Sequence, residues 1–270
     1  MKYRIAFSDI DGTLLNADRE PSALLIREVA RLTAAGVPFI LISSRMPPAM
    51  SWMQDMLGIP GLPLVAYNGG LVMVDGKVAH SEEIPLMIVR AVQECNRSLK
   101  LSVQLFYADE WYVESRDNYA LREQNNTRVT PTVRKLAETA ADWKKRNCGA
   151  HKIMVMGDPA GLDEITGFLE RVFGTMLHLY RSKEDYLEIA SRDISKRTGT
   201  EMVLAIKYPD LTLADCIAFG DNHNDVEMLK GVGLGVAVAN AKAEVLAVAD
   251  VTTAAAKSDG VALALAQYVK

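Results

Sequence analysis

The sequence predicts an α/β fold, a doubly wound parallel sheet that is interrupted by an inserted α+β domain. Two observations support this prediction. Short apolar runs alternate with helical patterns up to about residue 82 and again from about residue 195, whereas hairpins and helices mix in between. Polar residues directly follow four of the apolar runs, and ligands bind at this end of the strands in open α/β sheets.

The first part of the chain predicts alternating buried strands and helices. Apolar residues recur at helical spacing in 21–35 and Gly36 supplies a stop, so this range is expected to be an amphipathic helix. Asp75-Gly76 lies between two short runs and is a strong hairpin signal. Including these, we expect strands at 5–7, 37–42, 63–67, 71–74 and 77–80, and helices at 21–35 and from Pro47 onward.

An insert at 83–184 is expected to separate the two halves of the sheet domain, 1–82 and 185–270, and its size is typical of a domain. In and just after the insert we expect helices at 85–99, 135–146 and 158–173, and strands at 102–106, 111–114, 152–156, 175–180 and 186–190. The alternation then resumes with helices at 195–207, 242–249 and 259–268, and strands at 216–219, 234–238 and 250–252.

The composition argues against several classes of protein. A net charge of -4 gives no reason to expect nucleic acid as a partner. Three widely spaced cysteines argue against a disulfide framework or a zinc site and favour reduced thiols. No apolar run approaches the ~18 residues of a membrane-spanning helix, and no secretory leader follows Lys2 and Arg4. We therefore expect a soluble cytoplasmic protein without a membrane partner, and the sequence carries no signal for an oligomeric state.

The stretch FSDIDGT, residues 7–13, ends the first expected strand. Side chains alternate along a strand, so Asp9 and Asp11 leave it on the same side. Two neighbouring carboxylates repel each other, and a divalent cation such as Mg²⁺ relieves that repulsion. Gly12 lets the backbone turn sharply after them. The sequence therefore predicts a magnesium site at the end of this strand.

Four polar clusters fall at the carboxyl ends of four expected strands. Together they supply the carboxylates, hydroxyl, amide and guanidinium groups that phosphoryl transfer needs as nucleophile, metal ligands and hydrogen-bond donors. Simpler alternatives are a helix N-cap for Ser43, a structural ion pair for Arg45 and a turn for Asn68. The clusters are Asp9 with Asp11, Ser43 with Arg45, Asn68 with Gly69, and Asp221 with Asn224 and Asp225.

Four motifs make the chain resemble the haloacid dehalogenase superfamily of phosphohydrolases: DIDGTLL, Ser43 after an apolar strand, Lys196 in LEIASRDISKR, and GDNHND. The NGG after the third strand, the place of the insert, and AVANA followed by DGVA resemble its Cof-type subgroup, in which the insert is a large α/β cap. The resemblance implies a Mg²⁺-dependent phosphatase that hydrolyses a small phosphorylated metabolite, a sugar phosphate being the expected class, through an aspartyl-phosphate. It also implies that the cap selects the substrate.

The resemblance assigns a role to each motif residue. Asp9 is expected to be the nucleophile and Asp11 the general acid and base, and both are expected to contribute to the metal site. Lys196 is expected to hold Asp9 ionised, and Ser43 to donate to the phosphoryl group. The other expected ligands are Asp221 and Asp225 for the metal, and Ser44, Arg45, Asn68, Gly69, Lys196 and Asn224, beside Ser43, for the substrate.

The chain departs from the subgroup at two places. Arg197 follows the lysine where glycine is usual, and Ser43-Ser44-Arg45 stands where Thr-Gly-Arg is usual. Three other functions stay open: a phosphomutase, a phosphatase dedicated to one sugar-phosphate intermediate, and a phosphate- or metal-binding module without turnover. The presence of both Asp9 and Asp11 argues against the last of these.

Overall fold

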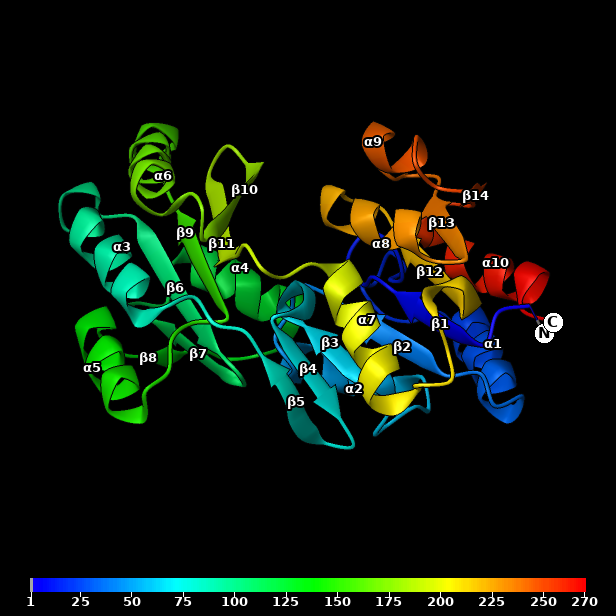
Figure 1. The fold of residues 1–270 in the computed structure, drawn as a ribbon. Helices are drawn as coiled ribbons and strands as arrows, with labels where there is room; N and C mark the ends of the chain where they lie inside the picture. Colours follow the sequence, from blue (N-terminus) through cyan, green and yellow to red (C-terminus); the bar gives the residue numbers. More distant parts are fainter. Residues whose placement is uncertain (1) are drawn as a thin grey trace. The chain divides into compact units, whose positions relative to one another are not determined.

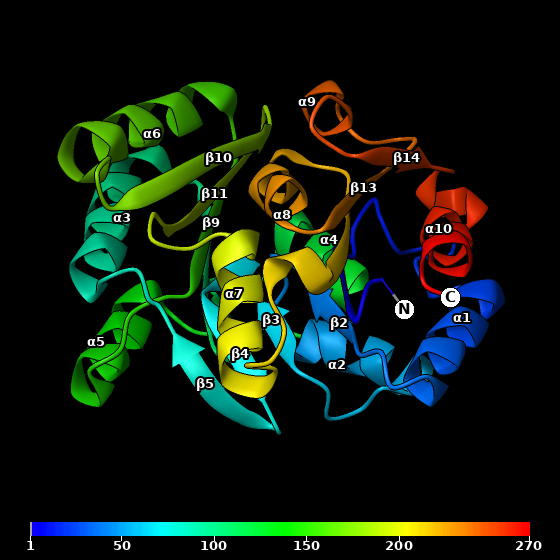
Figure 2. The same cartoon turned by 45° about the vertical axis from the view of Figure 1, so that its right-hand side comes forward.

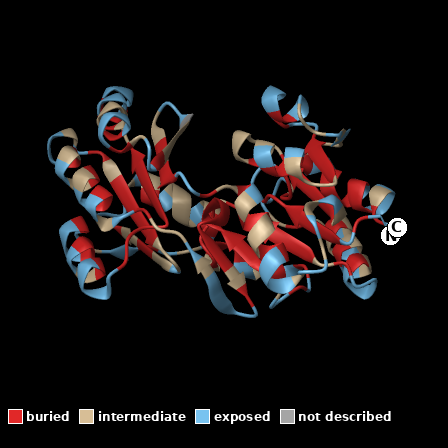
Figure 3. Ribbon diagram, in the orientation of Figure 1, coloured by how far each residue is buried: buried red, intermediate tan, exposed pale blue. Residues whose placement is uncertain are grey.

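The computed structural model describes residues 2–270, apart from the side chain of Ser182, and the chain divides into two compact units. Unit 1 contains the described residues up to His80 together with Ser195–Lys270, and unit 2 contains Ser81–Ile194. Figure 3 shows that in both units the buried residues gather on the strands and on the helix faces turned toward them. Each unit therefore has a core of its own.

Unit 1 is built on one mostly parallel sheet with the strand order β14-β13-β12-β1-β2-β3-β4-β5 (Figure 1). The strands from β14 to β3 run parallel, and β4 pairs antiparallel with β3. The chain thus winds outward from β1 in both directions. The strands are β1 (Ile5–Ser8), β2 (Phe39–Ile42), β3 (Leu64–Ala66), β4 (Leu71–Val74), β5 (Lys77–Ser81), β12 (Cys216–Gly220), β13 (Leu234–Val238) and β14 (Val251–Thr253).

Helices cover both faces of this sheet. The first and last helices, α1 and α10, pack together on one face, and α7 packs against α8 on the other (Figures 1 and 2). The helices are α1 (Ala23–Ala34), α2 (Pro48–Met56), α7 (Lys196–Lys207), α8 (Val226–Gly231), α9 (Ala243–Leu246) and α10 (Gly260–Tyr268). Short 3₁₀ turns are η1 (Tyr67–Gly69), η2 (Leu213–Asp215), η3 (His223–Asp225) and η4 (Ala256–Ser258).

Unit 2 is an α+β unit whose sheet has the order β10-β11-β9-β6-β7-β8. Its strands pair antiparallel, except that β7 and β8 are parallel. Residues of α3, α5 and α6, among them Trp143 and Leu169, form a hydrophobic core with the strands. The elements are α3 (Leu86–Leu99), β6 (Ser102–Tyr107), β7 (Glu110–Val113), α4 (Asn118–Thr127), β8 (Thr132–Val133), α5 (Leu136–Arg146), β9 (Lys152–Met156), α6 (Pro159–Phe173), β10 (Leu177–Lys183) and β11 (Tyr186–Ser191).

The structure confirms the predicted α/β fold class but moves one boundary of the insert. The prediction ended the insert at residue 184, whereas β11 pairs with β9 and β10, so unit 2 continues to Ile194. The elements α4, β8 and α8 were not predicted. Only Ala120 and Thr127 of α4 are buried, so this helix has no apolar periodicity to detect. The other two are short, and α9 ends at Leu246 rather than at residue 249.

Two features can be compared with the predictions from composition. Within residues 2–270, every helix is too short or too polar to span a lipid bilayer. The thiols of Cys95, Cys148 and Cys216 are unpaired, as the odd number and wide spacing of the cysteines indicated.

Helix α7 approaches the sheet of unit 1 closely because two glycines face each other. A Cβ on Gly199 would lie 2.5 Å from Val65 Cγ1 and 3.0 Å from Gly69 Cα. A Cβ on Gly69, which has a φ of +104°, would lie 2.6 Å from the carbonyl oxygen of Ser195. Ser195 is the N-cap of α7 and forms a capping box with Thr198. The glycines therefore let the first turn of α7 rest against the end of β3.

We predict that Gly199→Ala destabilises unit 1 by about 1–3 kcal/mol, because the new methyl group overlaps the stiff Val65 side chain. The matched substitution is Gly167→Ala in the middle of α6, where a Cβ would meet only the flexible Arg171 side chain at 3.4 Å. It should raise stability by up to about 1 kcal/mol through helix propensity. Urea unfolding of both variants measures the difference, and equal stability of the two would contradict the close approach.

Candidate active site

A buried ammonium group lies between two carboxylates at the carboxyl edge of the unit 1 sheet. Lys196 Nζ donates to Asp9 Oδ1 at 2.5 Å and to Asp225 Oδ1 at 2.6 Å. Lys196 and Asp225 are completely buried, and Asp9 is 5% exposed. Asp9 follows β1, Lys196 begins α7 and Asp225 ends η3. Three segments that are far apart in the sequence therefore meet at one charged cluster.

The Asp221 carboxylate lies beside this cluster, and hydrogen bonds hold the loop that carries it. Asp225 Oδ2 accepts from the backbone N–H groups of Asp221 at 2.9 Å and Asn222 at 3.0 Å. Thr13 Oγ1 donates to Asp221 Oδ1 at 3.0 Å. One carboxylate oxygen from each of Asp9, Asp221 and Asp225 lies within 4.8 Å of the others. This spacing allows the three groups to share a metal ion.

The cluster is short of positive charge. Three carboxylates and one ammonium group give a net charge of -2 when all are ionised. Burial raises the pKa of Asp9 well above its ordinary value, although Lys196 opposes this effect. Burial, together with the charge of Asp225, raises the pKa of Asp221 to about 6. Burial alone would lower the pKa of Lys196, but the Asp225 and Asp9 carboxylates raise it overall.

These residues fit a divalent cation, whose charge would balance the cluster. The carboxylates of Asp9, Asp221 and Asp225 are close enough together to hold it. The fourth predicted ligand, Asp11, lies outside this group, and both of its oxygens accept hydrogen bonds from Arg45. Within the described part of the chain, buried Asn224 Oδ1 has no hydrogen-bond partner, and a hydrated ion would satisfy this acceptor. Carboxylate and amide oxygens are ligands that suit Mg²⁺.

Asp11 is held by two arginines. Arg45 donates to both of its oxygens, from Nε at 2.6 Å and from Nη2 at 2.8 Å, and Arg19 Nη2 donates to Oδ1 at 2.8 Å. Burial opposes them, but the hydrogen bonds and charges of Arg45 and Arg19 lower the pKa of Asp11 below its ordinary value. The ion pair named above as the alternative for Arg45 is therefore present. Arg19 lies on a loop that carried no motif.

Ser43 and Ser44 follow β2. Ser43 is buried, and its Oγ accepts from the backbone N–H of Arg45 at 3.2 Å. The N-cap of α2 is Pro47, so Ser43 does not cap that helix. The Ser43 hydroxyl hydrogen is left available for another acceptor. Ser44 is half-buried next to it.

Asn68 brings two of the predicted clusters together. Its Oδ1 accepts from Asn224 Nδ2 at 3.0 Å, which links the end of β3 to the loop after β12. Asn68 has a φ of +57°, a turn conformation that asparagine tolerates better than most residues. The neighbouring Gly69 lies against the first turn of α7, which is a packing reason for a glycine at this position.

Only one of the two adjacent cations of α7 points into the cluster. The Arg197 side chain is 45% exposed, and its Nε donates to Glu201 one helical turn later at 2.9 Å. Lys196 occupies the buried position, so replacing the usual glycine by arginine leaves the path of the lysine intact.

Three residues outside the predicted set also make contacts in the site: Thr13, Arg19 and Asn240. Asn240 Nδ2 donates to the carbonyl oxygen of Gly12 at 2.7 Å. Asn240 belongs to the AVANA stretch, which was a sequence signal without an assigned role. The contact between Thr13 and Asp221 spans most of the chain, so no local pattern could indicate it.

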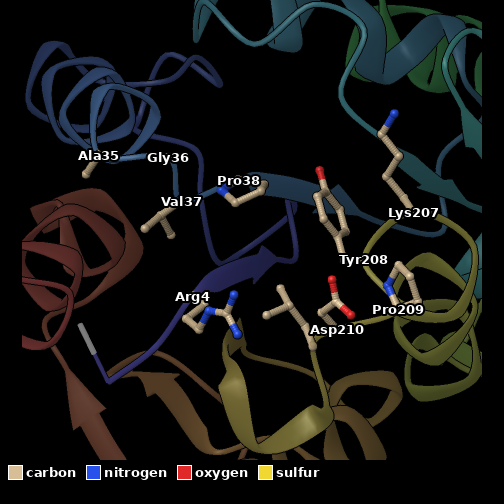
Figure 4. Close-up of a pocket in the computed structure, with 10 residues that line it drawn as sticks. Arg4, Ala35, Gly36, Val37, Pro38, Lys207, Tyr208, Pro209 and Asp210 are labelled. Carbon is tan, nitrogen blue, oxygen red and sulfur yellow. The ribbon is translucent and has the colours of Figure 1, made fainter.

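A concavity of about 440 Å³ lies at the amino-terminal edge of the same sheet (Figure 4). Arg4 precedes β1 and Pro38 precedes β2, which places this cavity at the strand ends opposite the charged cluster. Its lining contains none of the predicted site residues within the described part of the chain. The lining residues are Arg4, Ala35, Gly36, Val37, Pro38, Lys207, Tyr208, Pro209, Asp210 and Leu211.

Comparison with known proteins identifies the family of the chain. The sequence profile of the haloacid dehalogenase-like hydrolases matches residues 6–265. The chain belongs to this family. An HMP-PP phosphatase from Yersinia pestis is 30% identical to this hydrolase over 236 residues, which cover 87% of the chain and 83% of that relative. The chain is thus a phosphatase, a phosphoric monoester hydrolase of the Cof-type subgroup, as the sequence motifs implied.

Solved structures show the same fold as this hydrolase. A haloacid dehalogenase-like hydrolase from Bacteroides thetaiotaomicron is 25% identical with a TM-score of 0.87, covering 98% of this chain and 99% of that one. A protein from Thermotoga maritima is 26% identical with a TM-score of 0.87, covering 98% and 97%. A sugar phosphatase of subclass IIB is 21% identical with a TM-score of 0.80, covering 98% and 99%, and shares the fold.

We predict that Lys196→Ala lowers kcat of this hydrolase about 10²-fold or more, as loss of a preorganised charge contact does. Arg197→Ala is the matched control, because it removes a cation at the next position whose exposed ion pair contributes little. It should change kcat only a few-fold. Steady-state kinetics measures kcat of both variants. If Arg197 were the functional cation, Arg197→Ala would have the lower kcat of the two.

Proposed function

We propose that this hydrolase is a Mg²⁺-dependent phosphatase that cleaves a small phosphorylated metabolite, with sugar phosphates the expected class, through an aspartyl-phosphate on Asp9. The observation that supports this proposal most directly is the fixed position of Asp9 against the buried Lys196 ammonium group, with Asp221 beside it. A bound Mg²⁺ would neutralise charge, so that an anionic carboxylate could attack an anionic phosphate.

In the first half of the proposed reaction, the Asp9 carboxylate attacks phosphorus. The new O–P bond forms as the bond from phosphorus to the leaving oxygen breaks, and Asp11 gives that oxygen a proton. Asp11 leaves the same strand end two residues later. To carry the proton, Asp11 would have to be released from Arg45 and Arg19 when the substrate binds, since both arginines lower its pKa in the structure. Among the described residues, the Ser43 hydroxyl accepts a hydrogen bond from Arg45 and donates to none, so it is available to donate to a phosphoryl oxygen.

In the second half, a water molecule attacks phosphorus and Asp11 takes up its proton. The bond between Asp9 and phosphorus breaks, which releases phosphate and restores the carboxylate. Lys196 would keep Asp9 oriented through both steps because Asp225 holds the ammonium group from the other side. Asn224, which Asn68 positions, is placed to contact the phosphate or its solvent.

The variant Asp9→Asn tests the nucleophile. An amide keeps the shape and one oxygen ligand but is a poor nucleophile, so turnover of a generic aryl phosphate should fall by about 10³-fold or more. Calorimetric titration should show that Mg²⁺ still binds, and a chelator should abolish wild-type activity. Turnover within about tenfold of wild type would exclude the aspartyl-phosphate mechanism.

We further propose that unit 2 selects the substrate, and that the substrate is a free small molecule. Unit 2 has its own core and leaves the sheet domain after His80 and rejoins it at Ser195, so it is a separable element. The similarity to an HMP-PP phosphatase favours a small phosphorylated molecule as the ligand. The cytoplasmic location stays a prediction that rests on the reduced thiols.

Replacing residues 81–194 by a short linker tests this role. We expect the remaining protein to bind Mg²⁺ and to hydrolyse an activated aryl phosphate slowly, because every residue of the charged cluster lies in unit 1. Its kcat/KM values for different sugar phosphates should converge. A preference among sugar phosphates equal to that of the full chain would show that selection lies in unit 1.

A further inference from the structure

Asn240 is an exposed residue that contacts the turn after β1, and the mechanism above gives it no role. It lies in the turn after β13, in the AVANA stretch. Its Nδ2 donates to the Gly12 carbonyl oxygen at 2.7 Å, and its Oδ1 accepts from the backbone N–H of Ala256 at 2.8 Å. One partner is an obligate acceptor and the other an obligate donor, so the orientation of the Asn240 amide is determined.

The Gly12 carbonyl belongs to the turn that fixes Asp221. Gly12 has a φ of +85°, and a Cβ there would lie 2.2 Å from Asp221 Oδ2, so the turn touches the carboxylate directly. The carbonyl shares a rigid peptide plane with the Thr13 N–H. Thr13 Oγ1 in turn donates to Asp221 Oδ1. Holding the Gly12 carbonyl therefore limits where the Thr13 hydroxyl, and with it the Asp221 carboxylate, can lie.

The same segment also holds the backbone of Asp221. The N–H of Lys242 donates to the Asp221 carbonyl oxygen at 2.9 Å. In the sheet, β12 lies between β13 and β1, so residues 240–242 reach across the end of β12 to the turn after β1. They thereby tie together the ends of three neighbouring strands.

We propose that Asn240 is a positioning residue for Asp221, acting through the turn at Gly12 and Thr13, and that it sets the affinity of the site for Mg²⁺. The inference rests on the proposed Mg²⁺ dependence. Asn240 supplies no ligand itself, since both ends of its amide are occupied. Removing a residue that orients the ligands of a metal typically weakens metal binding by about 10–100-fold.

The test measures Mg²⁺ binding by calorimetry on the full chain without substrate. Asn240→Ala should weaken Mg²⁺ binding about tenfold or more, and kcat measured at subsaturating Mg²⁺ should fall and recover when Mg²⁺ is raised. Thr13→Val, which removes only the hydroxyl that contacts Asp221, should weaken binding similarly. The double variant should be less than additive because both changes act on one chain of contacts. Additive effects, or an unchanged affinity in Asn240→Ala, would overturn the proposal.

Ala256→Pro is the matched control. It removes the N–H that bonds to Asn240 Oδ1 and leaves the bond to Gly12 in place, and proline suits the first position of a helical turn. Ala255 is extended, as a residue before proline should be. The Mg²⁺ affinity of this variant should stay within about threefold of wild type. If Ala256→Pro instead weakens Mg²⁺ binding as much as Asn240→Ala does, then Asn240 acts by supporting the turn at η4 and not by positioning Asp221.

A further variant separates this inference from the proposed function. Asp221→Asn should lose Mg²⁺ binding if Asp221 is a ligand. If wild type and Asp221→Asn bind Mg²⁺ equally, the metal site itself is wrong. If Asp221→Asn loses binding while Asn240→Ala keeps it, only the role of Asn240 is wrong. Circular dichroism of each variant establishes that it is folded, and if Ala256→Pro does not fold, the comparison with Thr13→Val carries the test.

Discussion

The Lys196 ammonium group between Asp9 and Asp225 is the interaction on which the rest of the site depends. Burying an ammonium group is costly unless it is paired and hydrogen-bonded, and here two carboxylates meet that requirement. Removing Lys196 would leave two buried carboxylates facing each other without a cation between them. The end of β1, the start of α7 and the loop after β12 are therefore held in one arrangement, and Asp9 has a single position relative to Asp221.

Close packing makes this interaction possible. Lys196 is the first residue of α7, so the position of the ammonium group depends on how near the helix begins to the sheet. Gly69 and Gly199 allow that approach, since a methyl group on either would collide with the opposite segment. The glycine that the subgroup usually places after the lysine is absent here, but Gly199 faces the sheet and Arg197 faces solvent. For the close packing, the glycine must lie on the face of the helix that is turned toward the sheet. It does not have to follow the lysine directly.

The parts of the structure that could be predicted from the sequence are those encoded by local patterns. Continuous apolar runs indicated the parallel strands of unit 1, and the two-residue spacing of Asp9 and Asp11 indicated a polar strand end. The helix α4 escaped prediction because its polar residues show no apolar face, and the boundary at Ile194 because only strand pairing assigns β11 to unit 2. Thr13 and Asn240 each form a hydrogen bond to a residue more than two hundred positions away, and a local sequence pattern cannot indicate such a contact.

The central position of β1 in the sheet has a consequence for folding during synthesis of the chain. Ile5 pairs with Cys216, so the strand that precedes Asp9 gains its second neighbour only after more than two hundred further residues have been made. Until then a nascent or prematurely terminated chain presents Asp9 without the lysine and carboxylates that surround it, next to an open strand edge of the kind that promotes aggregation. In such fragments Asp9 lacks Lys196, Asp221 and Asp225, so the feature that matters for their fate is the unpaired strand edge, which favours aggregation.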